Sequence, residues 1–326
     1  MDANQLINSD NFPPTNDKLN VVDHISKFLG LAVSQLYLLC AFITCYEVIS
    51  RYVFDAPTQW AFETVMVLCA SAWMLSAGYI TLHRRHIGIT VIYIMMDKAK
   101  QWYLDLFAYV IGVIALWLFV DDTLVRAIES VMMTERAGSA WNSPQPLILK
   151  TMLVTGAMVY LTQLLVNLYR HFDSEIAKNV VSAVSAFIVF RIIMVFLEHT
   201  LELKGVIAIN EYLGSIAAYL EPTRYVDIRD IGIKWASILI VSLMVLLMMT
   251  GMPLGIVTLF VSILSALFYF GFNGLYLVST NAFGLLEAYP LIAVPLFVLM
   301  ASILEKAGVA EDLFDAMQIF AGKLRG

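Results

Sequence analysis

The chain has 326 residues, of which 60% are hydrophobic and only 14% are charged, and its formal net charge is −6. An ordinary soluble domain is about one quarter charged. This chain has too few polar side chains to cover a surface that faces water, which argues strongly against a soluble enzyme or a disordered chain. The negative charge and the lack of a basic stripe argue against nucleic-acid binding. We therefore predict an all-α polytopic integral membrane protein, because helices satisfy their own backbone hydrogen bonds in lipid.

Residues 1–26 are mostly polar and lack the basic start and short apolar run of a signal peptide, so we predict an N-terminal tail. Apolar runs recur beyond this tail. A helix needs roughly 20 apolar residues to cross the hydrocarbon core of a bilayer. We predict eight spans, which are Phe28–Ser50, Trp60–Leu82, Tyr103–Val120, Leu147–Tyr169, Val180–Leu197, Ile231–Met249, Leu254–Phe272 and Tyr289–Leu304.

The positions of lysine and arginine orient these spans. If the N-terminus is cytoplasmic, eleven of the 20 basic residues fall on the cytoplasmic side and six fall outside, as the positive-inside rule favours. We therefore predict that both termini are cytoplasmic. Residues 121–145 and 198–230 then form outer segments, and the short apolar stretch at residues 87–96 lies at the membrane interface.

Charged residues inside spans are functional hypotheses by default, because they are costly in lipid. An ion or proton pathway is one interpretation of those found here. Pairing between helices, with long side chains reaching the interface, is the other, and we favour it because the remaining carboxylate of the spans, Asp105, lies near the inner surface. The candidate network lies in the outer half of the predicted spans and consists of Glu47, Glu63, Lys150, Arg191 and Lys234.

Motifs for enzyme chemistry are missing from the sequence: no P-loop, dinucleotide fingerprint, HExxH or nucleophile elbow occurs. Cys40, Cys45 and Cys69 lie in apolar runs without a CxxC pair, which is typical of small packed side chains. His83 and His86 lie three residues apart and could share a helix face, but the arginines between them would repel a cation. We therefore predict neither catalysis nor a metal site.

The turn between the first two predicted spans carries a distinctive motif, and a basic stretch that ends in a histidine follows the second span. The motif residues are Arg51, Phe54, Pro57, Trp60, Glu63 and His86. This pattern resembles the small membrane subunit of tripartite ATP-independent periplasmic (TRAP) transporters. The resemblance implies a four-helix domain over residues 27–173.

A second set of motifs lies near the C-terminus. Pro253 belongs to a Gly-x-Pro turn between two apolar runs, and Pro290 and Pro295 mark the start and middle of the last run. This part resembles the beginning of the large TRAP membrane subunit and covers residues 231–326. Residues 174–230 then form a connector, whose apolar helix corresponds to the extra helix that joins the two subunits when they are fused.

The resemblance implies a membrane component of a secondary transporter in a bacterial inner membrane. Such a transporter takes up an organic acid, for example a dicarboxylate or sialic acid, with sodium as the coupling ion and no other cofactor. A periplasmic substrate-binding protein delivers the substrate, and the remaining large permease subunit or domain and the lipid bilayer are the other partners.

The resemblance places the substrate and sodium sites on hairpin tips that would lie beyond Gly326, so we expect this chain alone to lack the transport site. The alternative is a purely structural role, in which the chain braces a separately encoded large permease subunit.

The outer segments of the predicted topology hold twelve acidic and six basic residues. One interpretation is a docking surface for the binding protein, because complementary charge speeds and orients association. The alternative is that the acids merely accompany the positive-inside bias. Leu124, Ile128 and Met132 have helical spacing and would rest on the membrane or on neighbouring helices, which would turn the acids outward. The candidate docking residues are Asp121, Asp122, Glu129 and Glu135.

Overall fold

The computed structural model describes residues 20–201, 204–219, 232–288 and 290–321, and these contain helices and loops but no strand. The all-α polytopic fold is therefore confirmed. The helices of the N-terminal part are α2 (Val21–Tyr52), α3 (Ala61–Leu82), α4 (Val91–Ile94), α5 (Lys98–Met132), α6 (Gln145–His171), α7 (Glu175–Leu201) and α8 (Lys204–Tyr219). Those that follow are α9 (Ile233–Met249), α10 (Leu254–Phe270), the 3-10 turn η4 (Gly271–Gly274), α11 (Leu275–Leu286), α12 (Pro290–Lys306) and α13 (Val309–Ala321).

Six segments of the described chain are long and apolar enough to cross a membrane: α2, α3, α5, α6, α7 and the continuous stretch Leu254–Leu286. The other two predicted spans correspond to α9 and α12, which have 17 residues each. Most of the predicted polar tail, together with residues 220–231 and the last five residues, lies outside the described part of the chain.

Several described helices extend beyond their predicted bounds, among them α2 and α5. Helix α2 begins at Val21 rather than Phe28, and α5 continues to Met132 rather than ending at Val120. The predicted outer segment of residues 121–145 is therefore helical in its first half. The predicted span ended at Val120, before the charges of Asp121 and Asp122, which are costly in lipid. Asp121 pairs with Arg191 on α7, so the helix can continue.

The first four long helices form a bundle in which α3 and α6 lie at the centre, with α2 against α3 and α5 against α6. The main core joins this bundle to the C-terminal part. Ala115 of α5, Leu149 and Leu161 of α6, and Val257 of α10 are each at most 1% exposed and belong to one apolar cluster. The two parts of the chain thus share a core.

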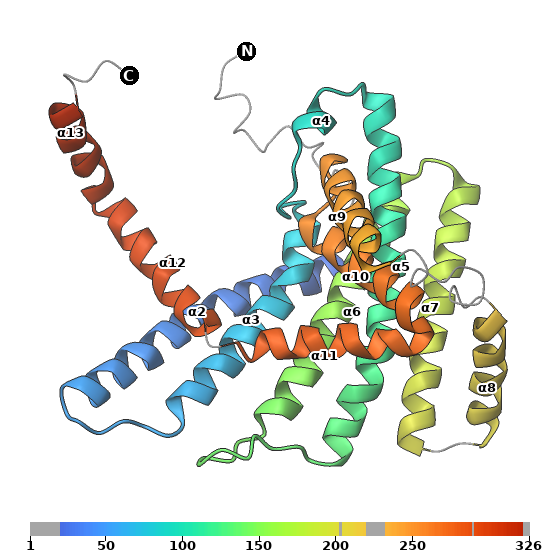
Figure 1. The fold of residues 1–326 in the computed structure, drawn as a ribbon, viewed down its shortest axis with the longest axis horizontal. Coiled ribbons are helices and arrows are strands. Elements are labelled where there is room, and N and C mark those ends of the chain that lie inside the picture. The colour runs from blue at the N-terminus through green and yellow to red at the C-terminus, as the bar shows by residue number, and fades with distance from the viewer. Residues whose placement is uncertain (1–19, 202–203, 220–231, 289, 322–326) are drawn as a thin grey trace.

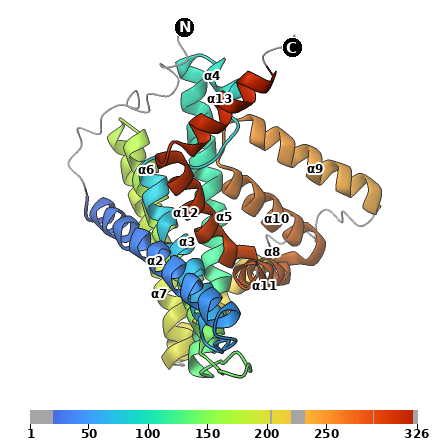
Figure 2. The same cartoon turned by 90° about the vertical axis from the view of Figure 1, so that its left-hand side faces the viewer.

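The connector and the C-terminal helices wrap around this bundle (Figures 1 and 2). Helix α7 packs on α5 and α6, and α8 packs back on α7. Helix α10 packs on α5, and α11 runs across α5 and α6 at a large angle to them (Figure 1). Helix α12 then returns the chain to α2 and α3. This path places α11 where its side chains can meet the far ends of α5 and α6.

Candidate functional site

The candidate site is the contact between the four-helix part and the C-terminal part, which we call the domain seam. On one side lie α5, α6 and the loop of residues 83–97. On the other side lie α10, α11 and the turn of residues 250–253. The seam has a polar end near α11, an apolar middle and a second polar end near α4.

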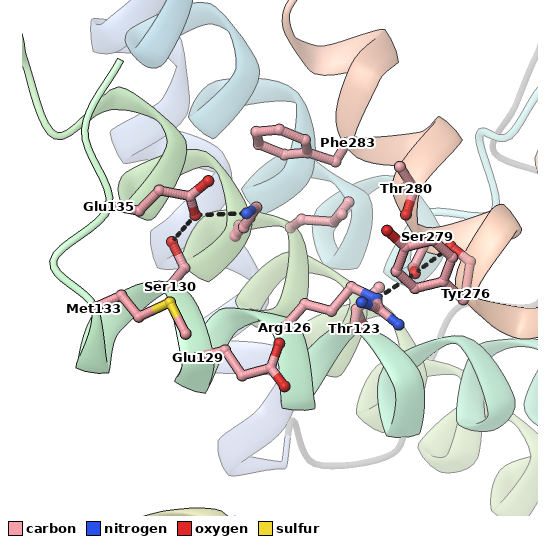
Figure 3. Close-up of a pocket in the computed structure, with 12 residues that line it drawn as sticks. Thr123, Arg126, Glu129, Ser130, Met133, Glu135, Tyr276, Ser279, Thr280 and Phe283 are labelled. Atoms are coloured by element: carbon pink, nitrogen blue, oxygen red, sulfur yellow. Dashed lines mark hydrogen bonds and ion pairs between the residues drawn. The ribbon is translucent and has the colours of Figure 1, made fainter. Parts of the chain in front are cut away.

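An arginine–aspartate pair on α5 holds α11 at the first end of the seam, and Figure 3 shows the arginine, Arg126, beside Ser279 and Tyr276 of α11. Arg126 Nε lies 3.2 Å from Asp122 Oδ2 and donates to Ser279 Oγ at 3.0 Å. The Ser279 hydroxyl in turn donates to Asp122. The guanidinium carbon of Arg126 lies 3.8 Å from the ring centroid of Tyr276, which is a cation–π contact. Two residues of α11, Ser279 and Tyr276, therefore contact an ion pair that lies within α5.

A second ion pair lies beside the first. Lys150 Nζ lies 2.5 Å from Glu135 Oε2, which also accepts the Ser130 hydroxyl at 2.6 Å, and the lysine lies 5.0 Å from the Phe283 ring centroid. Burial opposes ionisation of Glu135, but the bonds from Lys150 and Ser130 outweigh it and lower its pKa. A cavity of about 330 Å³ separates the two ion pairs, and residues of α5, α6 and α11 line it.

The middle of the seam depends on close helix packing. A Cβ atom at Gly112 of α5 would lie 2.8 Å from Leu164 of α6 and 2.9 Å from Ile256 of α10. Glycine at this position therefore lets three helices meet, as small residues do in membrane helix interfaces. Ile256 and Val257 are fully buried at this contact.

The second end of the seam is a backbone contact. The N–H of Leu254, one of the unpaired donors at the start of α10, donates to the carbonyl of Ile87 at 2.8 Å. Gly251 precedes it with a φ of +85°, a conformation that favours glycine. A Cβ atom there would lie 3.0 Å from Tyr93. The Gly-x-Pro turn that contains Pro253 thus fits against the loop that follows α3.

The motif residues of the four-helix part stabilise its turns. Arg51 donates to Glu47 at 2.5 Å, and the same carboxylate accepts the Thr58 N–H at 3.2 Å, so the loop is tied to α2. Trp60 stacks on Tyr46 with ring centroids 6.1 Å apart, whereas Phe54 and Pro57 are exposed. Glu63 is buried and accepts the Ser143 hydroxyl.

His86 lies in the loop of residues 83–97 and links that loop to α3 and α6. Its Nε2 lies 2.8 Å from the Thr81 hydroxyl, and its ring stacks on Tyr160 at 5.0 Å. Burial lowers the pKa of His86 to about 4, so the ring is neutral at pH 7. The His83 ring contacts Tyr79 instead, with ring centroids 4.3 Å apart and the ring planes tilted by 42°. The two histidines do not share a helix face as we expected, because α3 ends at Leu82.

The five residues of the predicted intramembrane network do not come together. Glu47, Glu63 and Lys150 have the separate partners described above, and Arg191 pairs with Asp121 at 3.4 Å and also donates to Asn210. Lys234 is exposed on α9, and no ion pair involves it in the described part of the chain. Of these pairs, Arg191–Asp121 joins two helices, whereas Arg51–Glu47 lies within α2 and Lys150–Glu135 joins α6 to the loop before it.

The predicted docking acids also differ from expectation. Asp121 and Asp122 of α5 and Glu135 of the loop after it are half-buried in ion pairs, so they do not point outward as a set. Glu129 is exposed at the rim of the cavity, and the described contacts include no ion pair for its side chain (Figure 3). Leu124 and Ile128 are buried as expected, whereas Met132 is exposed.

Sequence reasoning missed a buried polar cluster inside the four-helix part. Asp23 of α2 is 0% exposed and accepts Gln163 Nε2 at 3.0 Å and Arg170 Nη1 at 3.1 Å, both from α6. Gln163 also accepts the Ser26 hydroxyl at 2.8 Å. The polar stripe Gln163, Asn167 and Arg170 on α6 is a signal that predicts a partner, but Asp23 fell within the predicted tail.

The remaining motif prolines lie in the C-terminal part. Pro290 starts α12, and Pro295 is buried within it. Cys40 of α2 and Cys69 of α3 are buried with their sulfurs 3.5 Å apart, and Cys45 is exposed. No group of three or more histidine, cysteine, aspartate or glutamate side chains suited to a metal ion occurs among residues that the structure describes.

Comparison with known families divides the chain at the same place as the seam. Residues 40–174 match the family described as "Tripartite ATP-independent periplasmic transporters, DctQ component". Residues 240–326 match the family described as "Tripartite ATP-independent periplasmic transporter, DctM component". A search of curated proteins found no significant match. The two matched regions lie on opposite sides of the contacts described above.

Proposed function

Because this chain belongs to the TRAP transporter membrane proteins, as a small subunit fused to the start of the large subunit, we propose that its four-helix part holds the first large-subunit helices in a fixed position during transport. A moving transport domain requires a part that stays still relative to the membrane. The domain seam supplies the attachment between the two regions.

The observation that carries this proposal is that the seam is fixed at both ends. Ser279 and Tyr276 bind the Arg126 side chain at one end, and Leu254 donates to the Ile87 carbonyl at the other. A contact at one end alone would leave α10 and α11 free to pivot. Two polar contacts joined by close apolar packing oppose that rotation.

We further propose that the complete transporter couples sodium entry to the uptake of an organic acid delivered by a periplasmic binding protein. The family membership supports this reading. Of the four docking acids, Glu129 alone combines exposure with the lack of an ion pair in the described part of the chain. Docking through charge would therefore depend on Glu129, with the other three acids shaping the helices beneath it.

The experiment is sodium-driven uptake of radiolabelled dicarboxylates and sialic acid into proteoliposomes, with a binding protein and the full set of permease helices present. We expect the combined change of Arg126→Met and Ser279→Ala to lower uptake at least severalfold. The matched control is Arg51→Met, which removes an ion pair outside the seam and leaves uptake near the wild-type rate. Equal uptake by the seam variant and the control would refute the bracing role.

The second candidate function is that of a scaffold for a separately encoded large subunit, which the contact of α12 with α2 and α3 also permits. The two functions differ in one measurement. A scaffold shows uptake only when a separate large subunit is co-reconstituted, and the large subunit should then co-purify with this chain.

A further inference from the structure

A second cavity, of about 170 Å³, lies at the α4 end of the seam. The loop of residues 83–97, α5, α6 and the turn of residues 250–253 enclose it. Its lining combines one arginine, one aspartate and three tyrosines with the apolar side of Ile256. Such a mixture of charges at a helix junction differs from the surrounding apolar core and points to a polar ligand.

The arginine of this cavity occupies an unusual backbone position. Arg84 caps the C-terminal end of α3 with a φ of +51°, where glycine is the usual residue, and its N–H donates to the Thr81 carbonyl at 3.2 Å. The left-handed conformation is unfavourable for a residue with a Cβ atom. A backbone outlier of this kind is common where a side chain has a functional task. The Arg84 guanidinium carbon lies 5.9 Å from the Tyr109 ring centroid.

An opposite charge faces the same space without pairing with the arginine. Asp105 lines the cavity and accepts the Tyr93 hydroxyl at 3.1 Å. The salt bridges of the described residues include neither Arg84 nor Asp105. The Tyr160 hydroxyl, which also lines the cavity, is buried and has no hydrogen-bond partner among the described residues. His86 adds no charge at pH 7. The cavity therefore presents one cation, one anion and an unused hydroxyl.

The surroundings indicate the depth of the cavity in the membrane. Ile87 and Met95, on the same loop, are each 82% exposed, and water would be an unfavourable neighbour for both. Arg85, Lys98 and Lys100 are exposed nearby. Apolar side chains beside a basic cluster are typical of a segment that rests in the headgroup region of a bilayer.

We propose that this cavity binds a zwitterion that carries a phosphate and a primary ammonium, the chemistry of a phosphoethanolamine headgroup. Arg84 and the Tyr160 hydroxyl would donate to the phosphate, and Asp105 would accept from the ammonium. The ligand would bridge the two charges that do not reach each other. Because the turn of residues 250–253 closes the cavity, the bound headgroup would contact both sides of the seam.

The test is native mass spectrometry of the purified full chain in detergent, titrated with phosphatidylethanolamine, phosphatidylglycerol or phosphatidylcholine. We expect phosphatidylethanolamine to bind most tightly. Arg84→Gly should weaken it about tenfold, as expected for the loss of a charge-assisted hydrogen bond. Asp105→Asn should remove the preference for ethanolamine over glycerol headgroups, because the second lipid lacks the ammonium.

Arg84→Gly also separates binding from folding. Glycine suits the φ of +51°, so the thermal stability of this variant should equal or exceed that of the wild type. Arg84→Asn, which also tolerates this conformation, is the second variant. Arg85→Gln and Asp97→Asn are the matched controls, since both residues are exposed and neither lines the cavity.

Free phosphoethanolamine identifies the source of the ligand. Displacement of the lipid at similar concentrations would indicate that the headgroup suffices, and a failure to displace would indicate that the acyl chains are also required. Equal binding of the three lipids to the wild type, or unchanged binding by Arg84→Gly, would overturn the proposal. The bracing role does not depend on this site, so seam variants should retain their effect on uptake in either case.

Discussion

Replacement of Arg126 by methionine tests the seam most directly. Methionine keeps the unbranched stem and removes the guanidinium, so the packing volume changes little while three interactions are lost: the bonds to Asp122 and Ser279 and the contact with the Tyr276 ring. Among the described residues, Asp122 then keeps only the Ser279 hydroxyl as a partner for its charge.

The contacts of Arg126 determine how much the free energy of unfolding should fall in Arg126→Met. Hydrogen bonds to a charged group contribute about 1.5–3 kcal/mol, and a partly exposed cation–π contact contributes about 0.5–1 kcal/mol. The Arg126 and Asp122 side chains are 26% and 20% exposed, so solvent screens part of this. We expect a loss of about 2 kcal/mol in the free energy of unfolding. In a chain of 326 residues, with an unfolding entropy of about 2.1 cal/mol/K per residue, that loss corresponds to a fall in Tm of about 3 °C.

The assay is heat treatment of the purified protein in detergent, followed by size-exclusion chromatography of the protein that remains folded. Ser279→Ala and the double variant complete a mutant cycle across the seam. Because Arg126 lies on α5 and Ser279 on α11, a coupling energy of about 1 kcal/mol is expected between them. Arg51→Met, whose side chain is 48% exposed, should lose less than about 1 kcal/mol.

Additive effects of the two seam substitutions, within about 0.3 kcal/mol, would refute the reasoning. Such a result would mean that Ser279 and Arg126 act on stability independently. A fall in Tm for Arg51→Met equal to that for Arg126→Met would also refute it, because the effect would then be a general consequence of losing an arginine.

Three further predictions concern topology and pH. Ser139 and Ser174 are exposed, and each can be replaced by cysteine in a background with Cys45→Ser. The two cysteines should be labelled from opposite sides of the membrane. Labelling of both from one side would contradict four crossings before the connector. Glu135 has a lowered pKa in the folded protein, so its contribution to the free energy of unfolding is complete above about pH 4.5 and is lost as the pH falls through the folded pKa. The Glu135→Gln variant lacks this carboxylate, so its Tm should not show this loss in the same acidic window. The pKa of His86 is about 4 in the folded protein and about 6.5 in the unfolded chain, so the unfolded chain gains the proton first as the pH falls. The free energy of unfolding should therefore fall between pH 6.5 and 4 by up to about 3 kcal/mol. A His86→Gln variant with the same acid sensitivity in that window would exclude this histidine as its source.

Sequence reasoning predicted the fold class and the two family regions, because both depend on local signals. Long apolar runs identify spans, and the motif around Arg51 and Pro57 and the turn at Pro253 are contiguous. The pairing of side chains depends on which helices meet, and that information is spread over the chain. Asp23 and Arg170 lie 147 positions apart, and Asp122 and Ser279 lie 157 apart. No periodicity within one helix reveals either pair.

Helix α11 is a second feature that could not be predicted from the sequence. Residues 275–286 mix apolar side chains with Ser279, Thr280 and Asn281, so no separate apolar run of span length marks them. The structure places the polar face of this short helix against the charged ends of α5 and α6. Its serine has a role because a half-buried ion pair lies opposite, and that ion pair belongs to a segment that the sequence analysis placed outside the spans.

The connector that joins the two halves changes how strong the seam has to be. Since α7 and the residues after it tether α10 and α11 to the bundle, their association is intramolecular, and a short tether gives an effective concentration on the order of millimolar. A contact with an intrinsic Kd near 1 mM, about 4 kcal/mol, would then already be half formed. Two separate polypeptides at micromolar levels would need a contact about a thousand times tighter to reach the same occupancy. A fused chain can therefore keep its halves in contact through a seam that would be too weak to join two separate chains.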